Sequence, residues 1–138
     1  MLWLVLGLVI FLGTHSTRIL APAWRDDYVA SGGRMTYRAI YSLLSLIGIV
    51  LIVWGYGKAW DDPVLLWDPP LWTRHIAALL MLFAFISLAV YALPAGRLKP
   101  MLKHPMLLAV KIWALAHLLA NGDLASVLLF GTFLLWAT

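Results

Sequence analysis

Apolar runs of membrane-spanning length restrict what this sequence can fold into. Five such runs follow one another, at residues 2–20, 36–57, 72–93, 105–120 and 123–138. A helix that crosses a bilayer needs about 20 apolar residues, so the last run is short. The pattern predicts an all-α, polytopic transmembrane helix bundle with about five membrane segments. Because the last run stops without a cap, we expect the sequence to be a piece of a longer protein.

Composition excludes a soluble protein and several kinds of site. The chain is 64% hydrophobic and 12% charged, whereas soluble domains are about half apolar and about 25% charged. Without cysteine, disulfides and thiolate metal ligands are excluded. No repeat, soluble segment or low-complexity tract divides the chain, so residues 1–138 are expected to form one transmembrane domain.

The basic residues predict the orientation of the chain. Seven of the ten basic residues lie in two connections on the same side, which are Arg18, Arg25, Arg34 and Arg38, and then Arg97, Lys99 and Lys103. The positive-inside rule makes that side cytoplasmic. We therefore expect a multi-pass protein of the bacterial inner membrane with a periplasmic N-terminus. Its expected partners are the lipid bilayer and an apolar small molecule, and no nucleic acid is expected to bind. A homo-oligomer is a further possibility.

Several residues mark the ends of the predicted helices. Pro105 suits a first helical turn, where its missing N–H is not needed. Gly122 is expected to close that helix in the left-handed conformation, and Asp123 to cap the next one. The Ser31-Gly32-Gly33 stretch is expected to be a flexible part of the first connection.

The four histidines are the main candidates for chemistry. His15 lies in the first apolar run, His75 near the external start of the third, His104 at the cytoplasmic start of the fourth, and His117 deep within the fourth. An imidazole inside an apolar run is costly and by default marks a functional position. Imidazole is also the usual protein ligand of haem iron.

Depth decides which histidines could share an iron. At 1.5 Å per residue, His117 lies about 18 Å beyond the start of its helix and His15 about 20 Å beyond the start of the first. Both are near the midplane, so His15 with His117 is the preferred pair of axial ligands. His75 with His117 is the second choice, whereas His104 and His75 lie at opposite surfaces.

Plainer explanations compete for the same residues. Each intramembrane histidine could simply form a hydrogen bond between helices. Lys111 could extend its amine toward the cytoplasm or pair with a haem propionate. Trp113 shares a helix face with His117, which fits stacking against a cofactor as well as ordinary packing.

The residues also resemble a known family. The similar stretches are His15-Ser16 with Arg18, residues 36–57, residues 66–75 and above all residues 103–126. On these stretches the chain resembles the NnrU family of bacterial membrane proteins, whose relatives include the plant and cyanobacterial 15-cis-zeta-carotene isomerase. The resemblance covers essentially the whole chain, and family members continue into at least one further membrane segment.

The resemblance implies a cofactor and two activities. The isomerase branch holds haem b through histidines that match His15 and His117, and isomerises a cis double bond in a polyene. The NnrU branch is associated with denitrification, in nitrite and nitric oxide reduction. Where the isomerase has a cysteine three residues before the second histidine, this chain has Ala114. A thiolate ligand is therefore excluded, which puts a redox ligand switch in doubt.

The expected function is thus that of a haem b-binding membrane protein of the NnrU type, linked to denitrification or acting as a polyene isomerase. His15 and His117 are the expected metal ligands, with His75 as a substitute, and Arg18, Arg38 and Lys111 are expected to contact the propionates. A cofactor-free assembly or scaffold protein is the plainer alternative. A membrane methyltransferase that uses S-adenosylmethionine is a weaker one. It rests on the resemblance of Lys103-His104-Pro105 to an RHP motif, without the later acidic segment.

Overall fold

The computed structural model describes residues 1–94 and 96–138 and is all-α, as predicted. The described residues form a single isolated β-bridge and no named strand. Their helices are α1 (Leu2–Leu20), α2 (Pro22–Gly32), α3 (Arg34–Ala59), α4 (Leu71–Ala92), α5 (Leu98–Leu102), α6 (Pro105–Ala120) and α7 (Leu124–Ala137). The five longest of these coincide with the five apolar runs.

Among the described helices, α1, α3 and α4 are long and apolar enough to cross a membrane. Helices α6 and α7 are equally apolar but have only 16 and 14 residues. Large apolar side chains cover the outer faces of the long helices; Val9 is 65% and Val53 68% exposed. Such faces are stable next to lipid rather than water, which indicates a membrane protein.

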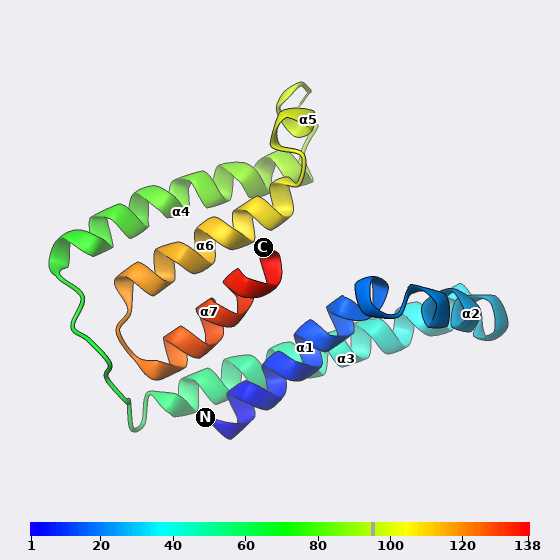
Figure 1. Cartoon of the computed structure of the whole chain (residues 1–138), viewed down its shortest axis with the longest axis horizontal. Coiled ribbons are helices and arrows are strands. Elements are labelled where there is room, and N and C mark those ends of the chain that lie inside the picture. The colour runs from blue at the N-terminus through cyan, green and yellow to red at the C-terminus, as the bar shows by residue number, and fades with distance from the viewer. Residues whose placement is uncertain (95) are drawn as a thin grey trace. The chain divides into compact units, whose positions relative to one another are not determined.

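The helices group into two compact units, Met1–Asp62 and Pro63–Thr138, and each is described by itself. In Figure 1 the first unit runs from blue to cyan and the second from green to red. The single domain expected over residues 1–138 stays a prediction.

Helices α1 and α3 of the first unit form an antiparallel pair (Figure 1), and their backbones approach closely at glycines. A Cβ added at Gly7 would lie 2.6 Å from the Ile52 nitrogen, and one at Gly48 would lie 2.9 Å from the Phe11 nitrogen. One added at Gly55 would lie 2.7 Å from the Leu4 Cα. Small residues allow this close approach. In lipid, where the hydrophobic effect does not drive helices together, the van der Waals packing of closely approaching helices stabilises their association.

The first connection is mostly helical, which corrects the expectation of a flexible stretch there. Helix α2 starts with Pro22 in its first turn and ends at Gly32. The Ser31 hydroxyl donates to the Asp27 carbonyl at 2.9 Å within this helix. Gly33 separates α2 from α3 with φ 84°, a conformation that glycine adopts without a steric penalty. Glycine here therefore makes a sharp break between two helices.

The second unit is built on α4 and α6, which lie side by side and antiparallel, with α7 packed along α6 (Figure 1). Alanines fill the contact between the helices; Ala77, Ala84, Ala109 and Ala116 are all buried. The short α5 lies in the connection between α4 and α6. As in the first unit, small side chains let the helices approach closely.

The turn between α6 and α7 is tied to the segment that precedes α4. The Gly122 carbonyl accepts hydrogen bonds from the Leu66 and Trp67 nitrogens, at 2.7 and 3.1 Å. The Leu124 nitrogen donates to the Val64 carbonyl at 2.9 Å. A Cβ at Gly122 would collide with the Trp67 carbonyl oxygen. The expected left-handed conformation of Gly122 is wrong, since the positive-φ glycines of the described residues are Gly33 and Gly96; the residue is needed for close approach instead.

The predicted cap of the last helix is confirmed. The Asp123 carboxylate accepts a hydrogen bond from the Ser126 nitrogen at 2.8 Å and one from the Ser126 hydroxyl at 2.6 Å. Ser126 is completely buried. The cap therefore satisfies a backbone N–H that the apolar surroundings would otherwise leave without an acceptor.

The glycine contacts predict an asymmetric response to alanine. Gly55→Ala should lower the free energy of unfolding by about 1–3 kcal/mol, the usual cost of overpacking, because its Cβ would meet the Leu4 backbone. Gly57→Ala, two residues further along α3, has open space around it and should leave stability unchanged or slightly raised. Denaturation of both variants in detergent, followed by circular dichroism, tests this; equal stabilities would contradict the close approach.

The Asp123 cap predicts a second matched pair. Asp123→Ala removes both hydrogen bonds to Ser126 and should cost about 0.5–2 kcal/mol. Asp123→Asn keeps an oxygen acceptor for the Ser126 nitrogen and should retain most of the stability. Unfolding midpoints of the two variants check this, and an Asn variant as unstable as the Ala variant would mean that charge rather than the cap matters.

Candidate functional site

His15 lies near the C-terminal end of α1, where the chain becomes polar and meets the start of α3. Its ring is 4.2 Å from the Phe11 ring on the same helix and 5.2 Å from the Tyr41 ring on α3, between centroids. Thr14 is buried beside it and donates to the Ile10 carbonyl at 2.7 Å. The half-buried His15 therefore stands between two aromatic rings, at the end of the first unit predicted to be cytoplasmic.

A basic cavity of about 440 Å³ opens next to His15. Three arginines, four hydroxyl side chains and one histidine line it. These residues are His15, Thr17, Arg18, Arg25, Tyr37, Arg38, Tyr41 and Ser42. None of these lining residues is a carboxylate. The cavity, called here the basic cavity, therefore has the charge and the donors to hold an anionic group.

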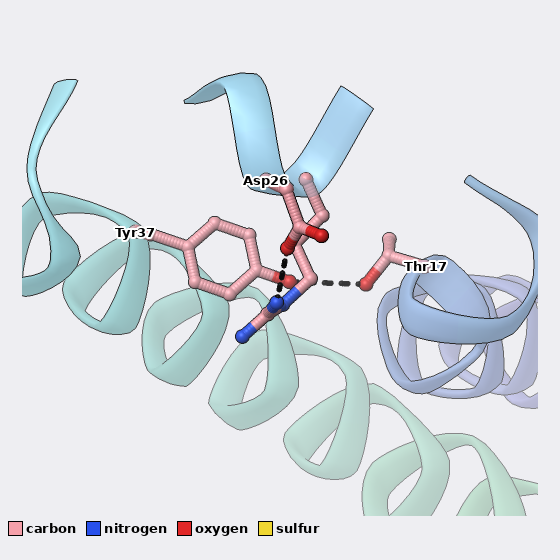
Figure 2. A network of polar contacts seen from close by, with 4 residues as sticks. Thr17, Asp26 and Tyr37 are labelled. Carbon is pink, nitrogen blue, oxygen red and sulfur yellow. Dashed lines mark hydrogen bonds and ion pairs between the residues drawn. The ribbon is translucent and has the colours of Figure 1, made fainter. Parts of the chain in front are cut away.

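Tyr37 joins the three helices around the basic cavity. Its hydroxyl lies 3.2 Å from the Thr17 Oγ1 of α1, as the dashed line in Figure 2 shows. The Arg25 guanidinium of α2 lies 5.5 Å from the centroid of the Tyr37 ring and pairs with Asp26 (Figure 2). A guanidinium over a tyrosine ring is attracted by the ring's negative face. Tyr37 thereby holds α2 against the hairpin of α1 and α3.

A second, apolar hollow of about 330 Å³ lies next to the basic cavity. Aromatic and aliphatic side chains of α2 and α3 line it, together with two threonines of α1. The lining residues are Thr14, Thr17, Trp24, Tyr28, Tyr37, Ile40, Tyr41 and Leu44. Thr17, Tyr37 and Tyr41 line both spaces. This apolar hollow and the basic cavity are thus neighbours across one shared wall.

His117 lies in the last turn of α6 and packs against α7. Its ring is stacked on Phe130, with centroids 4.4 Å apart and planes 24° apart. Trp113, one turn earlier, lies 5.4 Å from the His117 ring and meets Phe130 and Phe133 edge-on, at 5.0 and 5.5 Å. The shared helix face predicted for Trp113 and His117 is confirmed, and the imidazole is set within an aromatic cluster.

The two histidines share one hydrogen-bonding arrangement. The Nδ1 atom of His15 lies 2.8 Å from the Phe11 carbonyl oxygen, and that of His117 lies 2.8 Å from the Trp113 carbonyl oxygen. A carbonyl only accepts, so Nδ1 must carry the proton in each ring. In the neutral imidazole Nε2 then holds the lone pair. A histidine that binds a metal through Nε2 usually has its Nδ1–H fixed in this way.

The other predicted residues have different surroundings. Arg18 and Arg38 lie with His15 around the basic cavity. Lys111 is half-buried in α6, whereas His75 is exposed near the start of α4 and His104 is exposed just before α6. His15 lies five residues before the end of α1 and His117 three residues before the end of α6, so both are nearer to a helix end than the expected midplane depth. The two histidines belong to different units, so their pairing on one iron stays a prediction.

Several residues of these surroundings were not predicted from the sequence. Arg25, Tyr37 and Tyr41 line the basic cavity, and Phe130 stacks on His117. The one available signal was the four-residue spacing of Tyr37 and Tyr41, which puts them on one face of α3. Their meeting with His15 depends on the register of α1 against α3, which no local motif encodes.

The described residues do not form a site for a bare metal ion. No three side chains of His, Asp or Glu gather there in a way that could hold a bare metal ion.

A small apolar hollow of about 130 Å³ lies between α4 and α6. It is lined by Met81, Ala84, Phe85, Leu88, Ala109, Val110 and Trp113. Trp113 thus connects this α4–α6 hollow to the aromatic cluster around His117.

Comparison with known proteins gives a single result for the family. The model of the family described as NnrU protein matches residues 3–138. Searches of curated proteins and of solved structures give no significant match. Because the match spans nearly the whole chain, including both histidines and their surroundings, the chain belongs to the NnrU family.

Proposed function

We propose that this protein binds one haem b, which His15 and His117 would hold through their imidazoles. The observation that carries the proposal is the arrangement shared by the two imidazoles. In each, Nδ1–H is donated to a carbonyl of the same helix at 2.8 Å, so the lone pair of the neutral ring is on Nε2. A hydrogen bond to Nδ1 fixes the orientation of the ring and raises its basicity as an iron ligand.

The surroundings of His15 fit the polar edge of a haem. Arg18 and Arg38 line the cavity that also contains His15, and arginine forms paired hydrogen bonds with carboxylates. The Tyr41 ring, 5.2 Å from the imidazole, limits how the ring can rotate. These residues would therefore hold an imidazole and two propionates on the same side of the first unit.

The surroundings of His117 fit the apolar part of a haem. Trp113 and Phe130 lie against the imidazole, and Phe133 extends the aromatic cluster through Trp113. Lys111 lies on the same helix, nearer its start, and is the proposed propionate contact in this unit. The histidine, held on two sides, would keep a constant orientation toward the iron.

Haem iron supplies one-electron chemistry and, when a ligand leaves, an open coordination site. A haem held firmly by two imidazoles suits electron transfer, in keeping with a role in nitrite and nitric oxide reduction. This is the first candidate function.

A specific observation favours a second candidate function, that of an isomerase acting on a polyene. The apolar α4–α6 hollow reaches Trp113, which touches His117, so an elongated apolar molecule could lie near the ligand.

The proposal predicts which histidines the haem spectrum depends on. His15→Ala and His117→Ala should each abolish the visible spectrum of a six-coordinate haem b in detergent-purified protein, oxidised and reduced. His104→Ala is the matched control, because that residue is exposed and would not contact the iron. A wild-type protein that stays colourless after haem is supplied would overturn the proposal and favour a cofactor-free scaffold.

His75→Ala separates the two ligand pairs. If His15 and His117 hold the iron, this exposed residue can be removed without changing the spectrum or the content of one haem per chain. Loss of the spectrum in His75→Ala, with His15→Ala unaffected, would instead identify His75 as the partner of His117.

The isomerase candidate predicts a dependence on the α4–α6 hollow. Leu88 lies in its wall and is 43% exposed, so Leu88→Trp should fill the space without entering the buried contact, and should reduce conversion of a cis-polyene supplied in liposomes while the haem spectrum is kept. Leu82→Trp, on the same helix outside the hollow, is the control. If the wild type and the control both fail to convert the polyene, electron transfer is the favoured function.

A further inference from the structure

The basic cavity and the apolar hollow of the first unit together have the form of a site for an amphiphile. They share the wall made by Thr17, Tyr37 and Tyr41. One space is lined by arginines and hydroxyls, and the other by aromatic and aliphatic side chains. A single molecule with an anionic head and a hydrocarbon chain would match both, whereas a haem at His15 leaves the apolar hollow without an occupant.

The charge of the basic cavity favours an anionic head. Arg18, Arg25 and Arg38 line it. Asp26 pairs with the Nη1 atom of Arg25, and the guanidinium has further N–H donors for a second anion. Arg25 is placed at the junction with the apolar hollow, because its guanidinium lies over the Tyr37 ring in the shared wall. A phosphate at this junction would receive a charge-assisted hydrogen bond from Arg25.

The apolar hollow favours a hydrocarbon chain. Trp24 and Tyr28 of α2, 5.6 Å apart between ring centroids, close one side of it. Ile40 and Leu44 of α3 form the other side and are 44% and 41% exposed. The hollow therefore continues onto the lipid-facing surface of α3, from which an acyl chain could enter without crossing water.

We propose that the first unit binds one anionic phospholipid at this corner of α1, α2 and α3. Its phosphate lies at the junction of the two spaces, against Arg25 beside the shared wall rather than against Arg18 and Arg38. One acyl chain lies in the apolar hollow between Trp24, Tyr28 and Leu44. The predicted orientation puts this corner at the cytoplasmic surface, where phospholipid head groups are found. The lipid fixes α2 to the helical pair and belongs to the folded protein.

This proposal does not depend on the haem. Arg25, Trp24, Tyr28 and Leu44 are not assigned to the iron or its propionates, so either proposal can fail alone. The competing explanation is a diffuse one, in which arginines and interfacial aromatic rings attract any anionic bilayer without a defined site. Such attraction depends on the number of charges, whereas a site depends on their position.

The test compares lipids and matched variants in the full chain, with and without haem. Purified protein in neutral detergent is equilibrated with phosphatidylglycerol or phosphatidylcholine of the same acyl chains, and retained lipid is counted by native mass spectrometry. We expect one retained phosphatidylglycerol, bound about tenfold more tightly than phosphatidylcholine. Inorganic phosphate at the same concentration should not displace it.

Two pairs of variants locate the lipid. Arg25→Gln should weaken phosphatidylglycerol binding about tenfold, whereas Arg34→Gln, an exposed arginine at the start of α3 outside both spaces, should not. Leu44→Trp should fill the hollow and reduce retention of both lipids. Leu43→Trp adds the same bulk to the same helix outside the hollow and should leave retention unchanged, which controls for folding.

Other outcomes would overturn the proposal. Equal losses in Arg25→Gln and Arg34→Gln would show diffuse attraction. Displacement of the lipid by inorganic phosphate, with Leu44→Trp equal to Leu43→Trp, would show an anion site without a chain. Equal retention of the two lipids by the wild type would exclude recognition of the head group.

Discussion

The close approach of α1 and α3 determines the rest of the first unit. Gly48 and Gly55 are seven residues apart, or two helical turns, so both face α1 along one stripe. With Gly7 opposite, they allow the two backbones to meet and fix the register of one helix against the other. That register brings Tyr41 to His15 and Tyr37 to Thr17. The basic cavity begins at Ser42, less than two helical turns from Gly48, and its shape depends on these glycine contacts.

The Nδ1–H of each candidate histidine, His15 and His117, is bonded within its own helix. An N–H in an apolar environment must find an acceptor, and the carbonyl four residues earlier provides one without help from another helix. An interhelical hydrogen bond, the plainer explanation for an intramembrane histidine, would instead orient the ring toward a protein partner. In the second unit the neighbouring helix contributes an aromatic face, Phe130, rather than a polar group. This arrangement stabilises the orientation of the ring.

The sequence predicted what depends on local composition and missed what depends on register. The apolar runs gave the helix positions, Pro105 gave the start of α6, and Asp123 gave the cap of α7. Gly122 was recognised as a special position for the wrong reason, because its contact with Trp67 joins segments more than 50 residues apart. Helix α2 was missed, since it lacks an apolar stripe and is held by Arg25 and Tyr37. His15 and His117 could be chosen as candidates because they lie in apolar runs, but Tyr37, Tyr41 and Phe130 enter their surroundings through packing that no motif records.

The lengths of α6 and α7 have a consequence for the membrane itself. A helix of 16 residues is about 24 Å long, and one of 14 residues is about 21 Å long. The hydrocarbon core of an ordinary bilayer is about 30 Å thick. A bilayer spanned by such helices would have to thin, or its head groups would have to bend inward, at a modest cost per ångström of mismatch. The second unit would thus bring the water boundary closer to His117 than its depth in the sequence indicates, and shorten the path of any proton, electron or small molecule to it.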